Sequence, residues 1–454
     1  MAAYITRTTA TSFTSRQKFT ASMWVKGDTP PAADTYWWSI GSGSAHITIY
    51  TASNGKINII GSGPSSNWYQ YSSIALSDPA AWYHVLISVD TTQSVANDRI
   101  KLSINGTLYA DDAYWNSRGY PDEDDELDAL VSGEIQYIGS NYGASGEEWL
   151  GIMSHVHYCD GYNYTASDFG ETDSTSGIWK IKTSPSVTYG NNGYFLKMED
   201  RTNLDLDSGT NAFTFTTTGT LTATYDNPSN NFATLNRLNV PVTPKPVFSN
   251  GNNTVVTQNA SGKYFGGTST LGMVGGKWYC EFKADSLATD GMVGINGASG
   301  EQARQNGQMS YSTSGFGYMN DGSKSTNLTD TSYGNSWTTA NVVGVAVDLD
   351  NLKIYFAKDN VWQDSGDPTS GASGTGAAFT ILAASATPEG FYAFGCGDKS
   401  TGSSTLSVNF GNGYFGTTAV TSAEADGAGI GAFEFAPPTG YYALCTKNIK
   451  AYGG

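Results

Sequence analysis

The clearest pattern in this chain is a strict alternation of apolar and polar residues, and residues 340–362 show it best. Positions 343–349 place valine and leucine on every second residue, and positions 352–357 do the same with leucine, isoleucine and phenylalanine. The pair Asp350-Asn351 separates the two runs. Period-two alternation across a short polar turn predicts an antiparallel β-hairpin.

Similar runs recur along both halves of the chain. The first half has them at 19–26, 82–90, 99–106, 137–140 and 149–159. The second half has them at 276–283, 292–296, 315–319, 391–394 and 406–411. No long window carries a helical period. Many short strands at regular spacing predict an all-β protein with two tandem antiparallel β-sandwich (jelly-roll) domains.

The boundary between the halves is predicted from proline. Pro241, Pro244 and Pro246 fall within six residues of one another in the segment 226–247. Because proline cannot donate to a sheet ladder and stiffens the chain, this segment is predicted to be a linker. The prediction is therefore a jelly roll over residues 1–225, a linker over 226–247, and a second sandwich with an extended C-terminal tail over 248–454.

The composition favours β-sheet structure and excludes some classes of binding partner. Of the 454 residues, 13% are aromatic, 54 are glycine and only 14% are charged, with a net charge of −17. An acidic protein lacks the basic surface that phosphate binding needs, so we expect no nucleic-acid partner. No run of 18 apolar residues exists, and the first 19 residues lack the apolar core of a secretion signal, so membrane insertion and signal-directed export are not expected.

One acidic run leaves two interpretations open. Six of the seven residues 122–128 are Asp or Glu. The first interpretation is a solvated loop. The second is a Ca²⁺ site on Asp122, Asp124 and Glu126, since hard cations take several carboxylate ligands.

The cysteines and histidines are not spaced for a metal. The four cysteines are scattered without a Cys-x-x-Cys pair and are expected to be buried free thiols. His155, His157 and Cys159 share one face of an ideal strand with Met153. Three ligands along a strand span ~13 Å at ~3.3 Å per residue, too far for one metal, so this face is predicted to be part of a sheet.

Both halves of the chain resemble known domain families. "FTASMWVK" (19–26), "WYHVLISVD" (82–90) and "LGIMSHVHYCDG" (150–161) make the first half resemble the concanavalin-A-like, laminin-G-type jelly roll. "GKWYCEF" (276–282) and "GVAVDLDNLKIYFAKDNVW" (344–362) make the second half resemble a SPRY domain. Both resemblances rest on residues that pack sheets, so they imply a fold and not an activity.

The two domains in this order resemble virion structural proteins of tailed bacteriophages. That resemblance implies a location on the tail or capsid surface, contacts with other virion proteins, a homo-oligomer, and a host-surface glycan or protein as ligand. The first hypothesis is a tail-fibre or spike component that recognises the host. The second is a capsid or tail decoration or adaptor protein with a mainly structural role, and a remote third is a glycan hydrolase.

Catalytic motifs do not support turnover. The sequence has no Gly-x-Ser-x-Gly elbow, P-loop or His-Glu-x-x-His motif, and all four histidines lie in the first half. A retaining glycosidase needs two carboxylates about 5 Å apart across one cleft. We therefore predict binding without catalysis and no cofactor.

Ligand-binding candidates come from loop aromatics and loop acids. Sugars stack on exposed aromatic rings and bond to polar side chains. Trp37 and Trp38 are consecutive, so on a strand one of them is expected to leave the core; rim or subunit-contact aromatics are the alternative interpretation. The first half supplies five candidates and the second half two, from loops that form the binding surface in SPRY relatives: Trp37, Trp38, Trp68, Tyr69, Trp115, Asp321 and Asp359.

Overall fold

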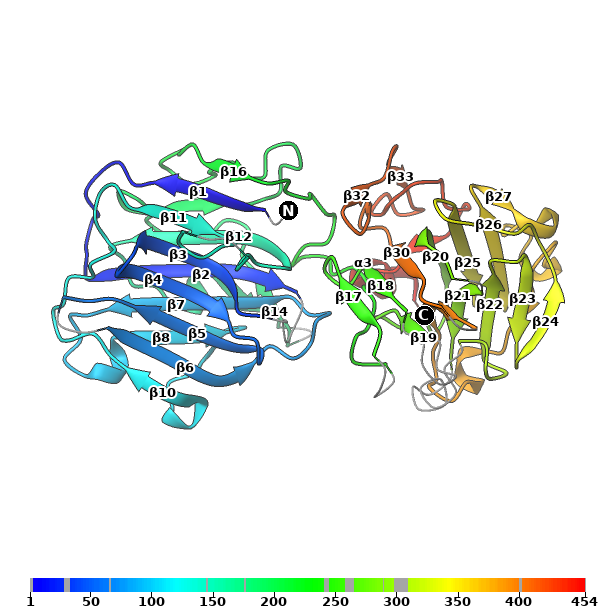
Figure 1. Cartoon of the computed structure of the whole chain (residues 1–454), viewed down its shortest axis with the longest axis horizontal. Coiled ribbons are helices and arrows are strands. Elements are labelled where there is room, and N and C mark those ends of the chain that lie inside the picture. The colour runs from blue at the N-terminus through cyan, green and yellow to red at the C-terminus, as the bar shows by residue number, and fades with distance from the viewer. Residues whose placement is uncertain are drawn as a thin grey trace. The chain divides into compact units, whose positions relative to one another are not determined.

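The computed structural model describes residues 3–27, 33–64, 67–143, 146–174, 177–240, 245–257, 265–288, 290–297, 309–399 and 402–453. The chain divides into two compact units, Met1–Ala223 and Thr224–Gly454, each built from antiparallel sheets (Figure 1). The all-β prediction with two tandem sandwiches is confirmed. None of the helices in the described ranges has the length and apolar character that crossing a bilayer requires.

The first unit pairs an eight-stranded sheet with a six-stranded sheet. In spatial order the larger sheet contains β10 (Trp115–Gly119), β6 (Trp68–Ala75), β5 (Lys56–Gly61), β4 (Ala45–Thr51), β3 (Thr35–Ser42), β11 (Ile135–Ile138), β1 (Tyr4–Thr8) and β16 (Thr216–Thr218). The smaller sheet contains β15 (Tyr194–Leu196), β12 (Ile152–Asp160), β2 (Lys18–Lys26), β7 (Tyr83–Asp90), β8 (Ile100–Ile104) and β9 (Thr107–Leu108).

The core of the first unit lies between these two sheets. Alternate residues of β2 and β7 point inward, and they meet the inward rows of β3, β4 and β5. Aliphatic side chains such as Ile49, Ile59 and Ile87 are fully buried there. Burial of this apolar surface is the main force that holds the two sheets together.

A long segment covers the outer face of the six-stranded sheet. It contains the short helix α1 (Ala166–Phe169) and the hairpin of β13 (Gly170–Thr172) and β14 (Trp179–Ile181). Phe169, Tyr189 and Phe195 pack with Leu86 and Cys159 in a second, smaller apolar cluster. Both faces of this sheet are therefore buried.

The second unit repeats the two-sheet plan. One sheet contains β17 (Val247–Ser249), β18 (Thr254–Val256), β30 (Thr405–Asn409), β20 (Lys277–Ser286), β25 (Val342–Asp348), β26 (Lys353–Lys358) and β27 (Val361–Trp362), with β28 (Phe379–Thr380) on β26 and β35 (Tyr442–Ala443) on β20. The other contains β19 (Phe265–Thr268), β29 (Ala393–Asp398), β21 (Gly291–Asn296), β22 (Gly315–Met319), β23 (Ser323–Thr326) and β24 (Thr329–Ser332).

The hairpin predicted over 340–362 is confirmed. β25 and β26 pair in register from Val343–Lys358 to Asp348–Lys353. Val345, Val347, Ile354 and Phe356 all lie in the core between the two sheets. The connection is a four-residue loop in which Leu352 has a positive φ of 58°.

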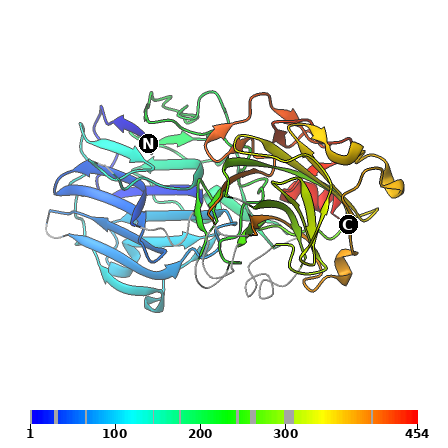
Figure 2. The ribbon, with the colours of Figure 1, turned by 45° about the vertical axis from the view of Figure 1, so that its right-hand side comes forward.

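The C-terminal segment covers the outer face of the first of these sheets. It forms the hairpins β31 (Tyr414–Phe415) with β32 (Thr418–Ala419) and β33 (Glu424–Ala425) with β34 (Ala432–Phe433), followed by α3 (Thr446–Tyr452). Phe433, Tyr441 and Ala443 pack on Tyr279 and Tyr355 of the sheet. In Figures 1 and 2 this orange-to-red segment lies against the green and yellow strands of the same unit.

The linker predicted over 226–247 is not a free connection. Residues 226–240 belong to the second unit, where Phe232 and Leu235 are buried and the N–H of Ala233 donates to the carbonyl of Leu444 at 2.9 Å. The apolar residues of this segment gain more free energy from burial than an extended, solvated chain would offer. Of the three prolines that suggested a linker, Pro241 and Pro244 lie outside the described residues, and Pro246 is buried.

All four cysteines are free and buried, as expected.

Candidate functional site

The outer face of the eight-stranded sheet carries one continuous row of residues across all eight strands. Residues that pair across neighbouring strands lie on the same face, so the registers define this row directly. Its members alternate along each strand with the residues that fill the core. From one edge of the sheet to the other they are Thr216, Thr6, Tyr137, Ser39, Thr48, Ile60, Tyr69 and Gly119.

A second row runs beside the first and brings tyrosines together. It contains Tyr36, Tyr50, Asn58, Tyr71 and Ser117. The Tyr36 and Tyr50 rings stack with centroids 4.7 Å apart, and the Tyr69 and Tyr71 rings stack at 5.0 Å. We call the five tyrosines Tyr36, Tyr50, Tyr69, Tyr71 and Tyr137 the tyrosine face.

Access to the tyrosine face differs along its length. Tyr71 is 36% exposed, and Tyr69 and Tyr137 are half-buried. Tyr36 and Tyr50 are mostly covered, with 9% and 7% of their surface exposed. The accessible part of the tyrosine face is therefore formed by Tyr69 and Tyr71 on β6. Tyr137 on β11 adds a further half-buried ring.

A loop that follows β11 borders this face along β3. The N–H of Tyr36 donates to the carbonyl of Glu147 at 3.3 Å, and the Tyr142 ring stacks on His46 with centroids 4.5 Å apart. The hydroxyl of Ser39 donates to the carbonyl of Ser140 at 3.0 Å. Burial, followed by the charge of Glu147, raises the pKa of Tyr36, so its hydroxyl stays protonated.

The side chains of the two rows are all uncharged. They offer aromatic rings, hydroxyls and one amide, and contain no carboxylate or imidazole. Stacked rings beside hydroxyl donors and acceptors suit a polar ligand that has an apolar face, such as a sugar ring.

Four of the predicted ligand-binding aromatics are not on this surface. Trp37 and Trp38 are fully buried, and Trp68 and Trp115 are 1% and 8% exposed. The prediction that these four rings meet a ligand is therefore wrong, because they fill the interior of the sandwich. Tyr69, the fifth candidate, does lie on the tyrosine face.

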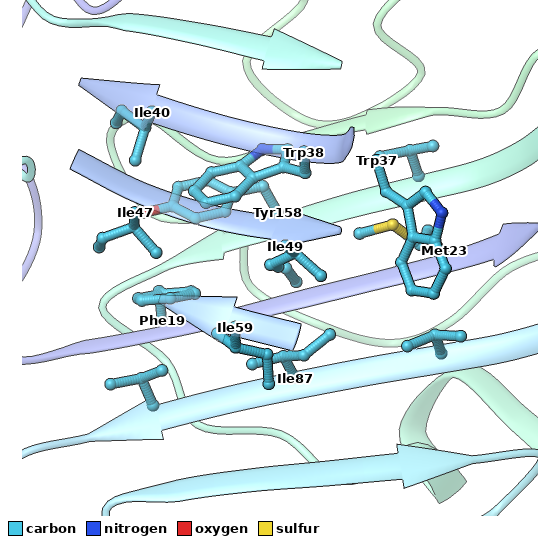
Figure 3. Packing of buried hydrophobic residues seen from close by; sticks show 14 of the residues in the cluster. Phe19, Met23, Trp37, Trp38, Ile40, Ile47, Ile49, Ile59, Ile87 and Tyr158 are labelled. Carbon is cyan, nitrogen blue, oxygen red and sulfur yellow. The ribbon is translucent and has the colours of Figure 1, made fainter. Parts of the chain in front are cut away.

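The burial of both Trp37 and Trp38 has a local cause. The register between β3 and β4 shifts between Tyr36 and Trp38, a β-bulge that adds a residue to β3 and re-aims its side chains. Figure 3 shows both indoles among the core side chains, with Trp38 over Tyr158 and Trp37 beside Met23. The Trp38 and Tyr158 rings stack with centroids 5.2 Å apart.

Comparison with known families identifies the two units. Residues 2–162 match the concanavalin A-like lectin/glucanases superfamily (laminin-G type), and residues 277–406 match the SPRY domain. The first unit contains a concanavalin-A-like domain, and the second a SPRY domain. No curated protein matches the chain in sequence.

Solved structures resemble parts of the chain remotely. A native heptameric SAP-like pentraxin from Limulus polyphemus is 16% identical, covering 35% of this chain and 69% of its own, with a TM-score of 0.25. The SPRY domain of human HERC1 is 15% identical, covering 36% of this chain and 91% of its own, with a TM-score of 0.26. Neither likeness says what this chain binds.

The two acidic candidates in the SPRY unit lie in turns. Asp321 is exposed and accepts hydrogen bonds from the N–H and the hydroxyl of Ser323 at 2.8 and 2.6 Å. Asp359 accepts from the N–H of Val342 at 2.9 Å and from the Asn341 amide at 2.6 Å, and it also lines a surface cavity. Asp321 thus stabilises its own turn, whereas Asp359 has a second environment, described below.

The acidic run of the concanavalin-A-like unit does not converge on a cation site. Glu126 forms an ion pair with Arg16 at 2.8 Å, and Asp125 accepts from the N–H of Asp122 at 2.9 Å. Within the described ranges no three His, Cys, Asp or Glu side chains gather as metal ligands. The calcium site suggested for Asp122, Asp124 and Glu126 is therefore not formed.

A buried Ser–His pair in the same unit is not arranged as a nucleophile. His84 Nε2 lies 2.8 Å from Ser22 Oγ, while Trp179 Nε1 donates to His84 Nδ1 at 3.1 Å. An indole N–H only donates, so His84 Nδ1 is unprotonated and its proton lies on Nε2, facing Ser22. His84 thus cannot take the serine proton, and burial lowers its pKa to about 3.

The shared face predicted for Met153, His155, His157 and Cys159 is interrupted. β12 has a bulge between Ser154 and His157, and His155 adopts a positive φ of 50°. Met153 packs toward the core between the sheets, whereas Cys159 lies in the cluster under the covering segment. An ideal strand places residues of equal parity on one face, and the bulge breaks that rule.

Four members of the tyrosine face were missed at the level of sequence. For Tyr71 a signal existed, because strict alternation in "WYQYSSIA" places it on the same face as Tyr69 and opposite Trp68. Tyr36, Tyr50 and Tyr137 join the face only through pairing between strands distant in sequence, which a single sequence does not reveal.

Proposed function

We propose that this protein binds a host-surface glycan without chemical turnover, through the tyrosine face of its concanavalin-A-like unit, as a tail-fibre or spike-type component of a tailed bacteriophage. The observation that carries the proposal is the stacking of Tyr69 on Tyr71 at the accessible end of a row that spans the sheet. The order of the two domains supports the virion assignment.

The proposed ligand follows from the surface chemistry. A sugar ring has an apolar face that packs on an aromatic ring, and hydroxyls at its rim that both donate and accept hydrogen bonds. Tyr69 and Tyr71 supply rings, and the neighbouring exposed Ser117 supplies a hydroxyl. Because the two rows carry no charged side chain, we propose a neutral glycan, with a host protein as the alternative ligand.

The proposal of binding without catalysis rests on the groups present. The tyrosine face has no acid or base that could protonate a leaving group, and His84 beside Ser22 is fixed in the wrong tautomer for general-base catalysis. We further propose a homo-oligomer on the tail or capsid surface that contacts other virion proteins. A capsid or tail decoration protein with a mainly structural role is the alternative.

A glycan array tests the ligand. The full chain is compared with the double variant Tyr69→Ala/Tyr71→Ala and with Tyr452→Ala, which removes a tyrosine that is 39% exposed in the SPRY unit. Each lost stacking contact should weaken binding roughly fivefold, an effect of about 1 kcal/mol. Equal binding by all three proteins would overturn the assignment to the tyrosine face.

Labelling of intact particles tests the virion role. An antibody against this chain should mark the tail tip if the protein is a fibre or spike component. Label on the head or along the tail, combined with an array that shows no binder, would favour the decoration role. No label on any particle would refute both.

A further inference from the structure

We infer that the SPRY unit carries a second binding site, a surface pocket that accepts a neutral saccharide ring between charged and aromatic side chains. The pocket is a half-open cavity of about 220 Å³ lined in part by Lys283, Asp359, Phe415, Glu434 and Phe435. It belongs to the second unit alone and does not depend on the tyrosine face.

Most residues that line the pocket lie outside the segment that matches the SPRY domain. The floor of the pocket lies at the end of β20 and the beginning of β25, where Lys283 pairs with Val342. Six of its ten lining residues, between Phe415 and Phe435, lie beyond the segment 277–406 that matches the SPRY domain. The site is thus a property of the C-terminal segment of this chain.

One wall is held by the turn between β26 and β27. Asp359 and Asn360 both have positive φ, 44° and 66°, as a tight hairpin requires. The two oxygens of Asp359 accept hydrogen bonds from Val342 and Asn341, which tie the turn to the adjacent strand. Each carboxylate oxygen keeps a second lone pair for a ligand.

Another part of the lining, residues 434–435, is held by the buried side chain of Glu281. Glu281 is fully buried on the outer face of β20 and accepts from the backbone N–H groups of Glu434 and Phe435, both at 2.8 Å. Asn409 and Tyr279 donate to the same carboxyl group, each at 3.2 Å. This fixes the chain at residues 434–435, and so positions the two side chains that line the pocket.

The polar groups of the pocket retain unused hydrogen-bonding capacity. Lys283 is half-buried with its ammonium 5.9 Å from the centre of the Phe415 ring, and it forms no ion pair within the described part of the chain. Glu434 accepts from the N–H of Thr421 at 2.6 Å through Oε2. Its Oε1 has no hydrogen bond among the described residues.

The combination of one ammonium, two carboxylates and two aromatic rings in the pocket limits the class of ligand that it can bind. Two carboxylates disfavour an anion, and the Lys283 ammonium is a hydrogen-bond donor that a simple cation leaves without an acceptor. The charged groups also exclude a purely apolar ligand. Sugar hydroxyls can accept from Lys283 and donate to Asp359 and Glu434, while the carbon skeleton lies against the aromatic side chains.

The test uses the full chain and calorimetric titration with neutral oligosaccharides of glucose, galactose, mannose and N-acetylglucosamine. The variants Lys283→Met and Glu434→Gln remove one charge each from the pocket. Lys450→Met is the matched control, because Lys450 is exposed and lies outside the pocket. Each protein is also carried in the Tyr69→Ala/Tyr71→Ala background, where the tyrosine face is disabled, and thermal unfolding verifies that every variant is folded.

We expect at least one oligosaccharide to bind the Tyr69→Ala/Tyr71→Ala protein and its Lys450→Met derivative equally. Lys283→Met and Glu434→Gln should raise the dissociation constant about tenfold, as loss of one charge-assisted hydrogen bond does. Absence of residual binding in the tyrosine-face background, or residual binding unchanged by both pocket variants, would overturn the pocket. Binding of short peptides in place of all the oligosaccharides would overturn the ligand class. Failure of the proposed function would be recognised separately, as full wild-type binding by the Tyr69→Ala/Tyr71→Ala protein.

Discussion

The two units share one architecture but differ in the titratable groups that they bury. Each sandwich has one sheet whose outer face is covered by a long segment of its own chain, under which a second apolar cluster forms. Under the cover of the concanavalin-A-like unit the buried titratable groups include His84 and His157. Under the cover of the SPRY unit the corresponding group is Glu281, and this unit contains no histidine.

Because of this difference, the stabilities of the two units are expected to change in opposite directions with pH. Burial lowers the pKa of His84 to about 3 and of His155 to about 4, from an ordinary 6.5. Burial raises the pKa of Glu281 to about 8 from 4.5, although its four hydrogen bonds act in the other direction. Both groups are thus favoured in their neutral forms, but neutrality requires a lost proton for histidine and a bound proton for glutamate.

The largest expected effect is acid destabilisation of the concanavalin-A-like unit alone. Between pH 6.5 and the lowered values, the unfolded chain binds protons at His84 and His155 that the folded unit does not, so stability falls as pH falls. Going from pH 7 to pH 4 should cost about 3 kcal/mol for each of the two histidines. Glu281 should contribute about 3 kcal/mol in the opposite direction to the SPRY unit, because at pH 7 the unfolded chain has lost a proton that the folded unit keeps.

Scanning calorimetry of the full chain at pH 7 and at pH 4 measures how far the unfolding transition of each unit shifts. The transition of the concanavalin-A-like unit should move down by roughly 10–20 °C, and that of the SPRY unit should hold or rise. Equal downward shifts of both transitions would refute the contrast between the units.

The second effect is local to the SPRY unit. Glu281→Gln replaces one acceptor oxygen with an NH₂ group that faces backbone N–H donors, so the C-terminal segment loses part of its attachment. We expect a loss of about 3 kcal/mol at pH 4, where the wild-type side chain is protonated whether the unit is folded or unfolded, and a smaller loss at pH 7, where the variant needs no proton to become neutral; denaturant unfolding measures both. The stabilisation of this unit at low pH should vanish as well.

The exposed residue Glu424 offers a matched control. Glu424→Gln should change the stability by less than about 0.5 kcal/mol. If the two variants behaved alike, Glu281 would not be the group that holds the segment.

A smaller effect is expected at the contact between Trp179 and His84. Trp179→Phe keeps most of the covering ring and removes the N–H that donates to His84 Nδ1. We expect a loss of about 1 kcal/mol and a rise in the pKa of His84, because that hydrogen bond favours the neutral imidazole. NMR titration of the His84 ring measures the pKa, with the unfolding transition of the SPRY unit as an internal reference.

The smallest effect separates binding from stability. Tyr71 is 36% exposed and stacks on Tyr69 at the surface, so Tyr71→Ala should change the free energy of unfolding by less than about 0.5 kcal/mol. Chemical denaturation measures this. A loss of several kcal/mol would mean that Tyr71 serves the fold, and would remove the reason to regard its exposure as functional.

The fold was largely predictable because its determinants are local. Alternation over 340–362 identified both strands and their inward faces, since period two is a property of neighbouring residues. The burial of both Trp37 and Trp38 was not predictable, because a bulge in β3 shifts the register without a mark in the hydrophobic pattern. The segment 226–240 was misassigned because its burial depends on contacts with the C-terminal segment some 200 residues away, such as that of Ala233 with Leu444.

The candidate site was less predictable than the fold. Tryptophans were chosen for their size, but large apolar rings fill cores as well as binding surfaces, and here Trp68 is buried on the face of β6 opposite the exposed Tyr71. The tyrosine face depends on cross-strand registers, such as Tyr36 with Tyr50 and Tyr137 with Ser39. Long-range pairing sets these registers, and alternation within one strand does not report it.

The most direct test of the central claim is a crystal structure of the full chain with the oligosaccharide that gives the strongest signal on the glycan array. The proposal predicts a sugar ring on Tyr69 and Tyr71, with hydroxyls bonded to neighbouring polar groups of the same sheet face and no bond cleaved. A ligand bound only elsewhere on the concanavalin-A-like unit, or a cleaved product in its density, would contradict it.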